Sequence, residues 1–208
     1  ALPGSTRGRY SRPASRVSQA PRKSPLARFE ARSTLVSSTI HRTGERYDVA
    51  QHRPALNEVH GRYVLRFART GEEIEEALRL RFEVFNLELG EGLEESHATG
   101  VDRDRFDDWC QHLVVFDRKR KRVIGTYRMQ TVEAARAGEG FYSSTEFDLA
   151  RVPTSVIDGT VELGRAAVSK EHRNRRVLHL LWRGLIAYLN FNRKRYFIGC
   201  CSLSPSER

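Results

Sequence analysis

The last third of the chain contains a strand, a helix and a second strand in succession, and this order restricts the fold more than any other feature. Residues 161–168 and 196–203 are runs rich in apolar and β-branched side chains. Between them, apolar residues recur at helical spacing and predict one buried helix face: Leu178, Leu181, Trp182, Leu185 and Leu189. This order predicts a right-handed βαβ unit, and therefore an α/β fold.

The middle of the chain predicts further elements for the same sheet. Residues 63–67 have the composition of a strand, and Thr70-Gly-Glu-Glu73 fits a capping box that begins a helix over about residues 71–89. Residues 112–116 and 123–129 are two more strand-like runs, and the basic run between them is typical of an exposed hairpin turn.

Two segments show no sustained period. Residues 1–58 are rich in Pro, Ser, Arg and Gly and are predicted to be a disordered arm. Residues 1–60 carry 11 Lys+Arg against 4 Asp+Glu, so this part holds +7 of the net charge of +10. Residues 131–159 form a long connection with no firm predicted structure, long enough to act as a binding segment or lid.

The cysteines and the hydropathy exclude several classes of protein. Cys110, Cys200 and Cys201 show no paired spacing, which is typical of reduced cytosolic thiols, and Cys200 is more typical of a core residue than of a nucleophile. Cys110-x-His112 lacks partners at metal-ligand spacing, so we predict no metal. No stretch approaches the roughly 18 apolar residues of a spanning helix, and we expect a cytoplasmic protein.

Short segments with charged residues follow one another in a recognisable order. They are RFEVF (81–85), DRFD (104–107), GTYR (125–128) and ELGR (162–165). In these segments the chain resembles the bacterial ornithine-lipid (ornithine N-acyl) transferases, which are related to acyl-homoserine-lactone synthases, and the likeness covers about residues 62–203. A tryptophan expected six residues beyond Phe85 in lactone synthases is Glu91 here, which favours the ornithine-lipid side.

The resemblance implies the GNAT (N-acetyltransferase) fold, a mixed β-sheet flanked by helices. It places an acyltransferase domain at residues 59–208 and leaves residues 1–58 as the basic arm. Folds of this kind normally continue with another helix and further strands after the point where this chain stops at Arg208. We therefore expect a fold that is truncated at its C-terminus.

Glu162 and Arg165 are the predicted catalytic residues. Glu162 is a carboxylate in an otherwise apolar strand and the leading candidate for a general base, with a structural ion pair as the alternative. In a regular strand the two side chains would face opposite sides, but Gly164 between them can accommodate a bulge that lets both line one cleft. The resemblance implies that such a strand also frees backbone N–H groups for a pantetheine amide or a thioester carbonyl.

A second set of residues is implied by the resemblance to bind substrate: Arg81, Phe85, Asp104, Asp107 and Arg128. The two cations and two anions could satisfy one another beside the core. Alternatively, the carboxylates could hold an ammonium group while an arginine grips a carboxylate. Both interpretations stay open, and the second suits an amino-acid acceptor.

Donor binding is predicted at the start of the last helix, where free N–H groups favour phosphate. Acetyltransferases have glycines at the positions of Arg176 and Leu178, which puts the cradling of a coenzyme A pyrophosphate in doubt. A basic rim suits the phosphopantetheine arm of an acidic acyl carrier protein, and we expect no tightly bound cofactor. The predicted donor-binding residues are Ala166, Val168, Arg173, Asn174, Arg175 and Arg176.

Together these expectations describe an enzyme that moves a fatty or 3-hydroxyfatty acyl chain from acyl carrier protein, or from acyl-CoA, to the α-amine of ornithine or a similar amino acid. The product would be a lyso-aminolipid, and we expect peripheral contact with the inner face of the membrane. One rival is a lactone synthase that uses S-adenosylmethionine as the amine. Others are a binding protein for nucleic acid or anionic membranes, which lacks the interleaved aromatics of single-strand binders, and an inactive fragment. We expect no specific nucleic-acid partner.

Overall fold

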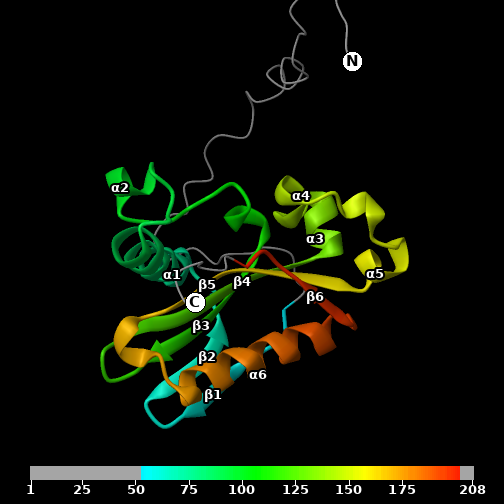
Figure 1. Cartoon of the computed structure of the whole chain (residues 1–208). Helices are drawn as coiled ribbons and strands as arrows, with labels where there is room; N and C mark the ends of the chain where they lie inside the picture. The colour runs from blue at the N-terminus through cyan, green and yellow to red at the C-terminus, as the bar shows by residue number, and fades with distance from the viewer. Residues whose placement is uncertain (1–52, 202–208) are drawn as a thin grey trace, which may run out of the picture. The chain divides into compact units, whose positions relative to one another are not determined.

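The computed structural model describes residues 53–201, which form a six-stranded mixed sheet with helices on both faces (Figure 1). Neighbouring strands from β1 to β5 are antiparallel, and β6 lies parallel to β5 after the crossover through helix α6. The predicted mixed sheet is thus confirmed. The strands are β1 (Asn57–His60), β2 (Tyr63–Phe67), β3 (Gln111–Asp117), β4 (Arg122–Thr131), β5 (Thr160–Val168) and β6 (Tyr196–Ile198).

Two long helices cover the sheet, and short helical turns fill the connections. The long ones are α1 (Gly71–Phe82), which continues as the π-helix η2 (Glu83–Leu89), and α6 (Arg175–Phe191). No helix among residues 53–201 is both long and apolar enough to cross a bilayer. The short ones are α2 (Ser96–Thr99), η3 (Asp107–Trp109), α3 (Val132–Ala137), α4 (Ser143–Glu146), η4 (Leu149–Arg151), α5 (Thr154–Asp158) and η5 (Lys170–His172).

The two faces of the sheet take alternate residues of its inner strands. On β3, Leu113 and Val115 belong to the core beneath α6, whereas Val114 packs in the cluster beneath α1. All three side chains are fully buried because helices cover both faces. This double cover explains why residues 113–116 form a continuous apolar run instead of an alternating one.

Helix α1 begins as its sequence predicts. The hydroxyl of Thr70 accepts a hydrogen bond from the Glu73 N–H at 3.2 Å. The Glu73 carboxylate returns to the N–H of Arg69 at 2.7 Å, one residue before the position that a regular capping box uses. The helix then continues as the wider π-helix η2, which ends at Leu89. The Leu89 side chain is 51% exposed and does not belong to the buried face of the helix.

The predicted buried face of α6 is only partly correct. Leu181 and Leu185 are buried, but Leu178 and Trp182 are 52% and 46% exposed, and Val177 and Tyr188 take their place in the core. Because the helix is apolar around most of its circumference, its spacing fits two stripes equally well. Packing selects the stripe that contains Gly184, where a Cβ would lie 2.5 Å from a methyl group of Leu113.

Three other expectations need correction. The sheet begins within the predicted arm, since β1 starts at Asn57 and Leu56 is buried; residues 1–52 lie outside the described part of the chain. The segment 131–159 is helical in four places and closes over a small apolar cluster that includes Phe141. The last strand ends at Ile198, short of the predicted 203.

Candidate active site

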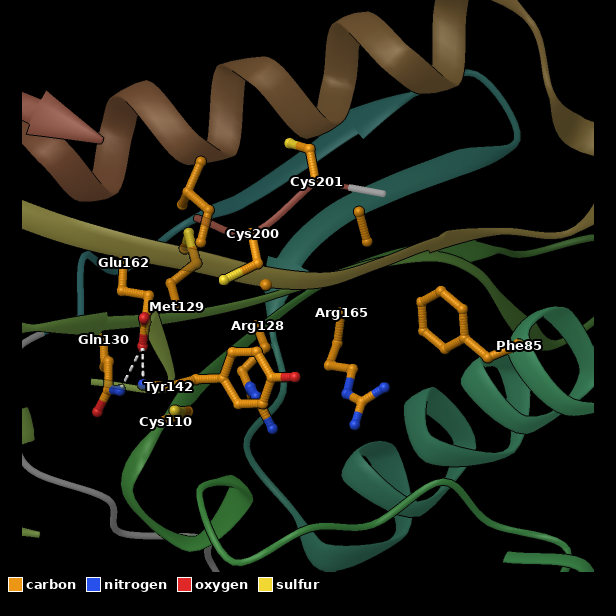
Figure 2. A pocket seen from close by; sticks show the side chains of 13 residues that line it. Phe85, Cys110, Arg128, Met129, Gln130, Tyr142, Glu162, Arg165, Cys200 and Cys201 are labelled. Atoms are coloured by element: carbon orange, nitrogen blue, oxygen red, sulfur yellow. Dashed lines mark hydrogen bonds between the residues drawn. The ribbon is translucent and has the colours of Figure 1, made fainter. Parts of the chain in front are cut away.

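A cavity of about 340 Å³ opens where β5 and β6 separate (Figure 2). The two strands pair only as far as Glu162 and Ile198. At Gly199 an added Cβ would lie 2.5 Å from the carbonyl oxygen of Leu163, so glycine permits this close approach just before the chains part. Beyond Glu162, no described strand pairs with β5 on this side, and its open backbone edge lines the cavity.

A bulge in β5 shapes the wall of the cavity. Thr126 of β4 pairs with Ala167, but Arg128 pairs with Gly164, so one residue of β4 lies opposite two of β5. The left-handed residue of the bulge is Arg165, with φ +49°, and not the neighbouring Gly164. A side chain in this region costs roughly 1–2 kcal/mol, which the surrounding contacts must offset.

The bulge brings Glu162 and Arg165 to one cavity, as predicted. Figure 2 shows both side chains reaching from β5 toward the same space, with the ring of Tyr142 between them in this view. Among the described residues, Glu162 is the one carboxylate that lines the cavity.

The Glu162 carboxylate is buried and fixed by three donors. Its Oε2 accepts hydrogen bonds from Gln130 Nε2 at 2.8 Å and from the N–H of Tyr142 at 2.9 Å. Its Oε1 accepts from the N–H of Ser143 at 2.6 Å. No ion pair joins it to another residue between 53 and 201, so the structural ion pair considered from the sequence is not formed there. Three of about four lone-pair directions are occupied, which leaves room for one further partner.

Beside the cavity lies a buried cluster of three arginines and three aspartates, Arg81, Arg128, Arg165, Asp102, Asp104 and Asp107, which balance in charge. Arg81 is fully buried and donates to Asp107 at 2.6 Å and to Asp102 at 2.8 Å. Arg128 donates to Asp104 at 2.5 Å and to Asp107 at 3.1 Å. For Arg81 and Asp107, which do not line the cavity, this arrangement favours structural pairing over substrate contact.

The electrostatics of the cluster follow from burial and mutual attraction. Burial alone would raise the pKa of the Asp107 carboxyl, but Arg81 and Arg128 outweigh it and hold that pKa well below its usual range. Burial likewise opposes the positive charge of Arg128. The negative charges of Asp107 and Asp104 outweigh this effect and raise the pKa of the Arg128 guanidinium. Burial raises the pKa of the Cys110 thiol, so this lining residue stays protonated.

Arg165 is the least tightly held arginine of the cluster. Its guanidinium nitrogens lie 3.4 Å from Asp104 and 3.6 Å from Asp102, longer than the contacts of Arg81 and Arg128. Its Cζ atom lies 5.7 Å from the ring centre of Phe85, which also lines the cavity. Phe85 and Arg128 are therefore the members of the predicted substrate set that reach the cavity.

The residues predicted to bind the acyl donor lie at the end of β5 and at the start of α6. Ala166 lines the cavity, and Val168 ends the strand with its carbonyl bonded to Arg173. The Arg173 guanidinium also pairs with Glu88 at 2.6 and 2.7 Å, and Asn174 caps α6 by accepting from the Val177 N–H. Two further arginines at this helix start, Arg175 and Arg176, are exposed and form no ion pair with another described residue.

Four residues at or beside the cavity were not predicted from the sequence. Asp102 precedes the DRFD segment and is wholly buried between two arginines. Gln130 and Tyr142 hold Glu162, but Tyr142 belongs to the segment that shows no period. Cys200, expected in the core, is exposed at the cavity. The sequence offered one signal for these residues: Gln130 and Glu162 are polar residues on strands that pair with each other.

Comparison with known proteins confirms the resemblance. A family model described as an acetyltransferase (GNAT) domain matches residues 80–183. An L-ornithine N(alpha)-acyltransferase of Brucella abortus is 37% identical over 149 residues, which cover 68% of this chain and 53% of the relative. One of Agrobacterium fabrum is 37% identical over 164 residues, covering 76% and 56%. The chain thus spans about half the length of these curated relatives.

Solved structures of acyl-homoserine-lactone synthases also match, at low identity. The synthase LasI is 15% identical with a TM-score of 0.46, over 66% of this chain and 71% of its own. The CoA-dependent synthase BjaI is 18% identical with a TM-score of 0.39, over 57% and 55%.

Proposed function

The chain belongs to the acetyltransferase (GNAT) family, and we propose that it supplies the catalytic cavity of an N-acyltransferase that acylates the α-amine of ornithine or a similar amino acid. The observation that carries this proposal is the position of Glu162. It is the one carboxylate among the described residues of the cavity wall, and it stands where the backbone edge of β5 becomes open. An amine acceptor and a thioester donor could therefore meet there.

For the acceptor, we assign the ammonium group to Glu162 and the carboxylate to Arg165. A fixed carboxylate attracts an ammonium group, and Glu162 retains one free acceptor direction after its three hydrogen bonds. The guanidinium of Arg165 makes only long contacts with Asp102 and Asp104, so it can take a carboxylate without breaking a short ion pair. The two side chains thus suit the two charges that every free amino acid carries.

For the donor, we propose that a pantetheine arm lies along the open edge of β5, near Ala166 and Val168. Free backbone groups of this edge would hold its amides and polarise the thioester carbonyl. Arg175 and Arg176 form no ion pair with another residue between 53 and 201 and are the candidate cations for its phosphate, whereas Arg173 is already paired with Glu88. An acidic acyl carrier protein is the carrier that this basic rim favours.

Transfer then proceeds directly between the two substrates. A free α-amino group titrates near pH 8, so the amine must lose a proton to Glu162, directly or through water, before or as it attacks. The new C–N bond forms as the C–S bond breaks, and the released thiolate takes up a proton from solvent. An acyl-enzyme on Cys110 is disfavoured, because its thiol is buried and protonated.

The first test is incubation of the chain with 3-hydroxyacyl carrier protein or acyl-CoA and a mixture of amino acids, followed by mass spectrometry. We expect an N-acyl amino acid, whose mass names the acceptor and whose donor dependence names the carrier. Release of methylthioadenosine from added S-adenosylmethionine would instead indicate lactone synthesis. If the folded chain gives no product with either amine, the proposed activity is wrong for this chain.

The second test is Glu162→Gln, with Glu139→Gln, an exposed carboxylate, as the matched control. We expect turnover to fall by about 10²–10⁴-fold while the donor KM changes little, because a positioned base acts on the chemical step. Turnover of the variant should rise with pH until the amine deprotonates by itself. Equal activity of Glu162→Gln and the control, in proteins of equal melting temperature, would exclude Glu162 as the base.

A further inference from the structure

Helix α6 covers one face of the sheet (Figure 1), and its outward face exposes a row of large apolar side chains. Leu178, Trp182 and Ile186 are 52%, 46% and 43% exposed. A spacing of four residues places them one after another along the helix. The opposite side of α6 is buried on the sheet, so this helix is apolar on both sides. Such a pattern indicates that the outward side also contacts an apolar surface.

The charged residues of α6 and of the segments that flank it have a single sign, although Glu58 of β1 lies beside the row. Residues 173–195 contain seven Lys+Arg and no Asp or Glu. Arg183 is compensated by Glu58 of β1 at 2.7 Å. Four other arginines are exposed and form no ion pair with any residue between 53 and 201: Arg175, Arg176, Arg193 and Arg195.

These cations lie at the two ends of the helix, with the apolar row between them. A helix of 17 residues is about 25 Å long, so the charges at its ends are far apart. A broad, flat surface of negative charge contacts both ends and the row at once, whereas a small acidic patch reaches only one end. The surface that combines negative charge with an apolar layer beneath it is an anionic lipid bilayer.

We propose that the outward face of α6, centred on Leu178, Trp182 and Ile186, is an in-plane binding surface for anionic membranes. The apolar row enters the boundary between headgroups and acyl chains, where tryptophan is favoured. The terminal arginines bind anionic headgroups. This inference goes beyond the proposed acyl transfer. It shares Arg175 and Arg176 with the proposed phosphate contact of the donor, but it is centred on the apolar row of α6 and not on the cavity.

The test is flotation of the full chain with vesicles of phosphatidylglycerol and phosphatidylcholine, and with phosphatidylcholine alone. We expect binding to the anionic vesicles, weakened by 0.5 M salt. The triple variant L178Q/W182Q/I186Q should lower the bound fraction at least about tenfold, because the apolar insertion is lost. The matched control is L87Q/F147Q, which replaces side chains that are 64% and 62% exposed on other elements and should bind normally.

A second measurement keeps the proposal testable if the triple variant does not fold. The sequence has two tryptophans, so Trp109→Phe leaves Trp182 as the sole emitter. Its emission should shift to the blue on anionic vesicles and be quenched by brominated lipid. An unshifted Trp182, or equal flotation of the triple and control variants, overturns the proposal. Binding of this face to an acidic acyl carrier protein without binding to the vesicles would also overturn it.

Discussion

Asp102 is a residue on which two arginines of the site depend. Its carboxylate accepts from Arg81 at 2.8 Å and lies 3.6 Å from Arg165, with no exposure to solvent. It therefore joins Arg81 in the core to Arg165, one of the two arginines that line the cavity. Because the cluster balances three cations with three anions, loss of one anion leaves an uncompensated buried charge.

We expect Asp102→Asn to lower the free energy of unfolding by about 3 kcal/mol or more, since breaking a buried ion pair from one side is costly. Urea denaturation measures this change. Asp108→Asn is the control, because Asp108 is exposed and its contact with Arg103 at 3.6 Å is worth little. Similar stabilities of the two variants would show that the cluster does not depend on Asp102.

At the scale of the element, the bulge of β5 decides which side chains face the cavity. Arg165 holds a left-handed backbone at φ +49°, although Gly164 beside it is the residue type that adopts this conformation freely. The guanidinium contacts with Asp102, Asp104 and Phe85 are the described interactions that hold Arg165 there. Side-chain contacts, and not local propensity, therefore decide which residue of the bulge is left-handed.

Two substitutions separate the backbone of Arg165 from its side chain. Arg165→Ala and Arg165→Gly remove the same guanidinium, but glycine relieves the strain at positive φ. We expect the glycine variant to be more stable than the alanine variant by about 1 kcal/mol in thermal or urea unfolding. Both should raise the KM for the amino-acid acceptor at least about tenfold with little change for the donor. Equal stabilities would contradict the strained bulge.

At the scale of the whole molecule, His112 makes the fold sensitive to acid. This side chain is buried on β3 beside Asp107, and burial lowers its pKa from 6.5 to about 4. The unfolded chain takes up this proton first as the pH falls. The neutral histidine's contribution to stability is therefore fully present above pH 6.5 and is lost progressively toward pH 4 and below.

We expect the free energy of unfolding to fall between pH 6.5 and 4, by up to about 1.4 kcal/mol per pH unit. His112→Gln should flatten this part of the pH profile, even if it lowers stability overall. His97→Gln, at an exposed position, should leave the slope unchanged. A slope that persists in His112→Gln would assign the acid sensitivity to other groups.

Much of the site was predictable because its residues are chemically out of place. A glutamate in an apolar strand stands out in the sequence, and so does Arg81, which falls at helical spacing among Ile74, Leu78 and Phe85. The structure buries Glu162 and Arg81 accordingly. Asp102 did not stand out, because an aspartate in a polar loop carries no such contrast. Tyr142 was missed because its N–H, a group that every residue except proline has, is what contacts Glu162.

The sequence by itself determined the positions of strands β2 to β6, the start of α1 at Thr70 and the parallel crossover, and it indicated that a bulge could place Glu162 and Arg165 in one wall. These depend on period, capping and spacing, which are local properties of the chain. Only the tertiary structure decided which stripe of α6 is buried, which residue of the bulge is left-handed and which arginine remains accessible. Each of these is a choice between locally equivalent states, and packing against distant segments supplies the free-energy difference that selects one.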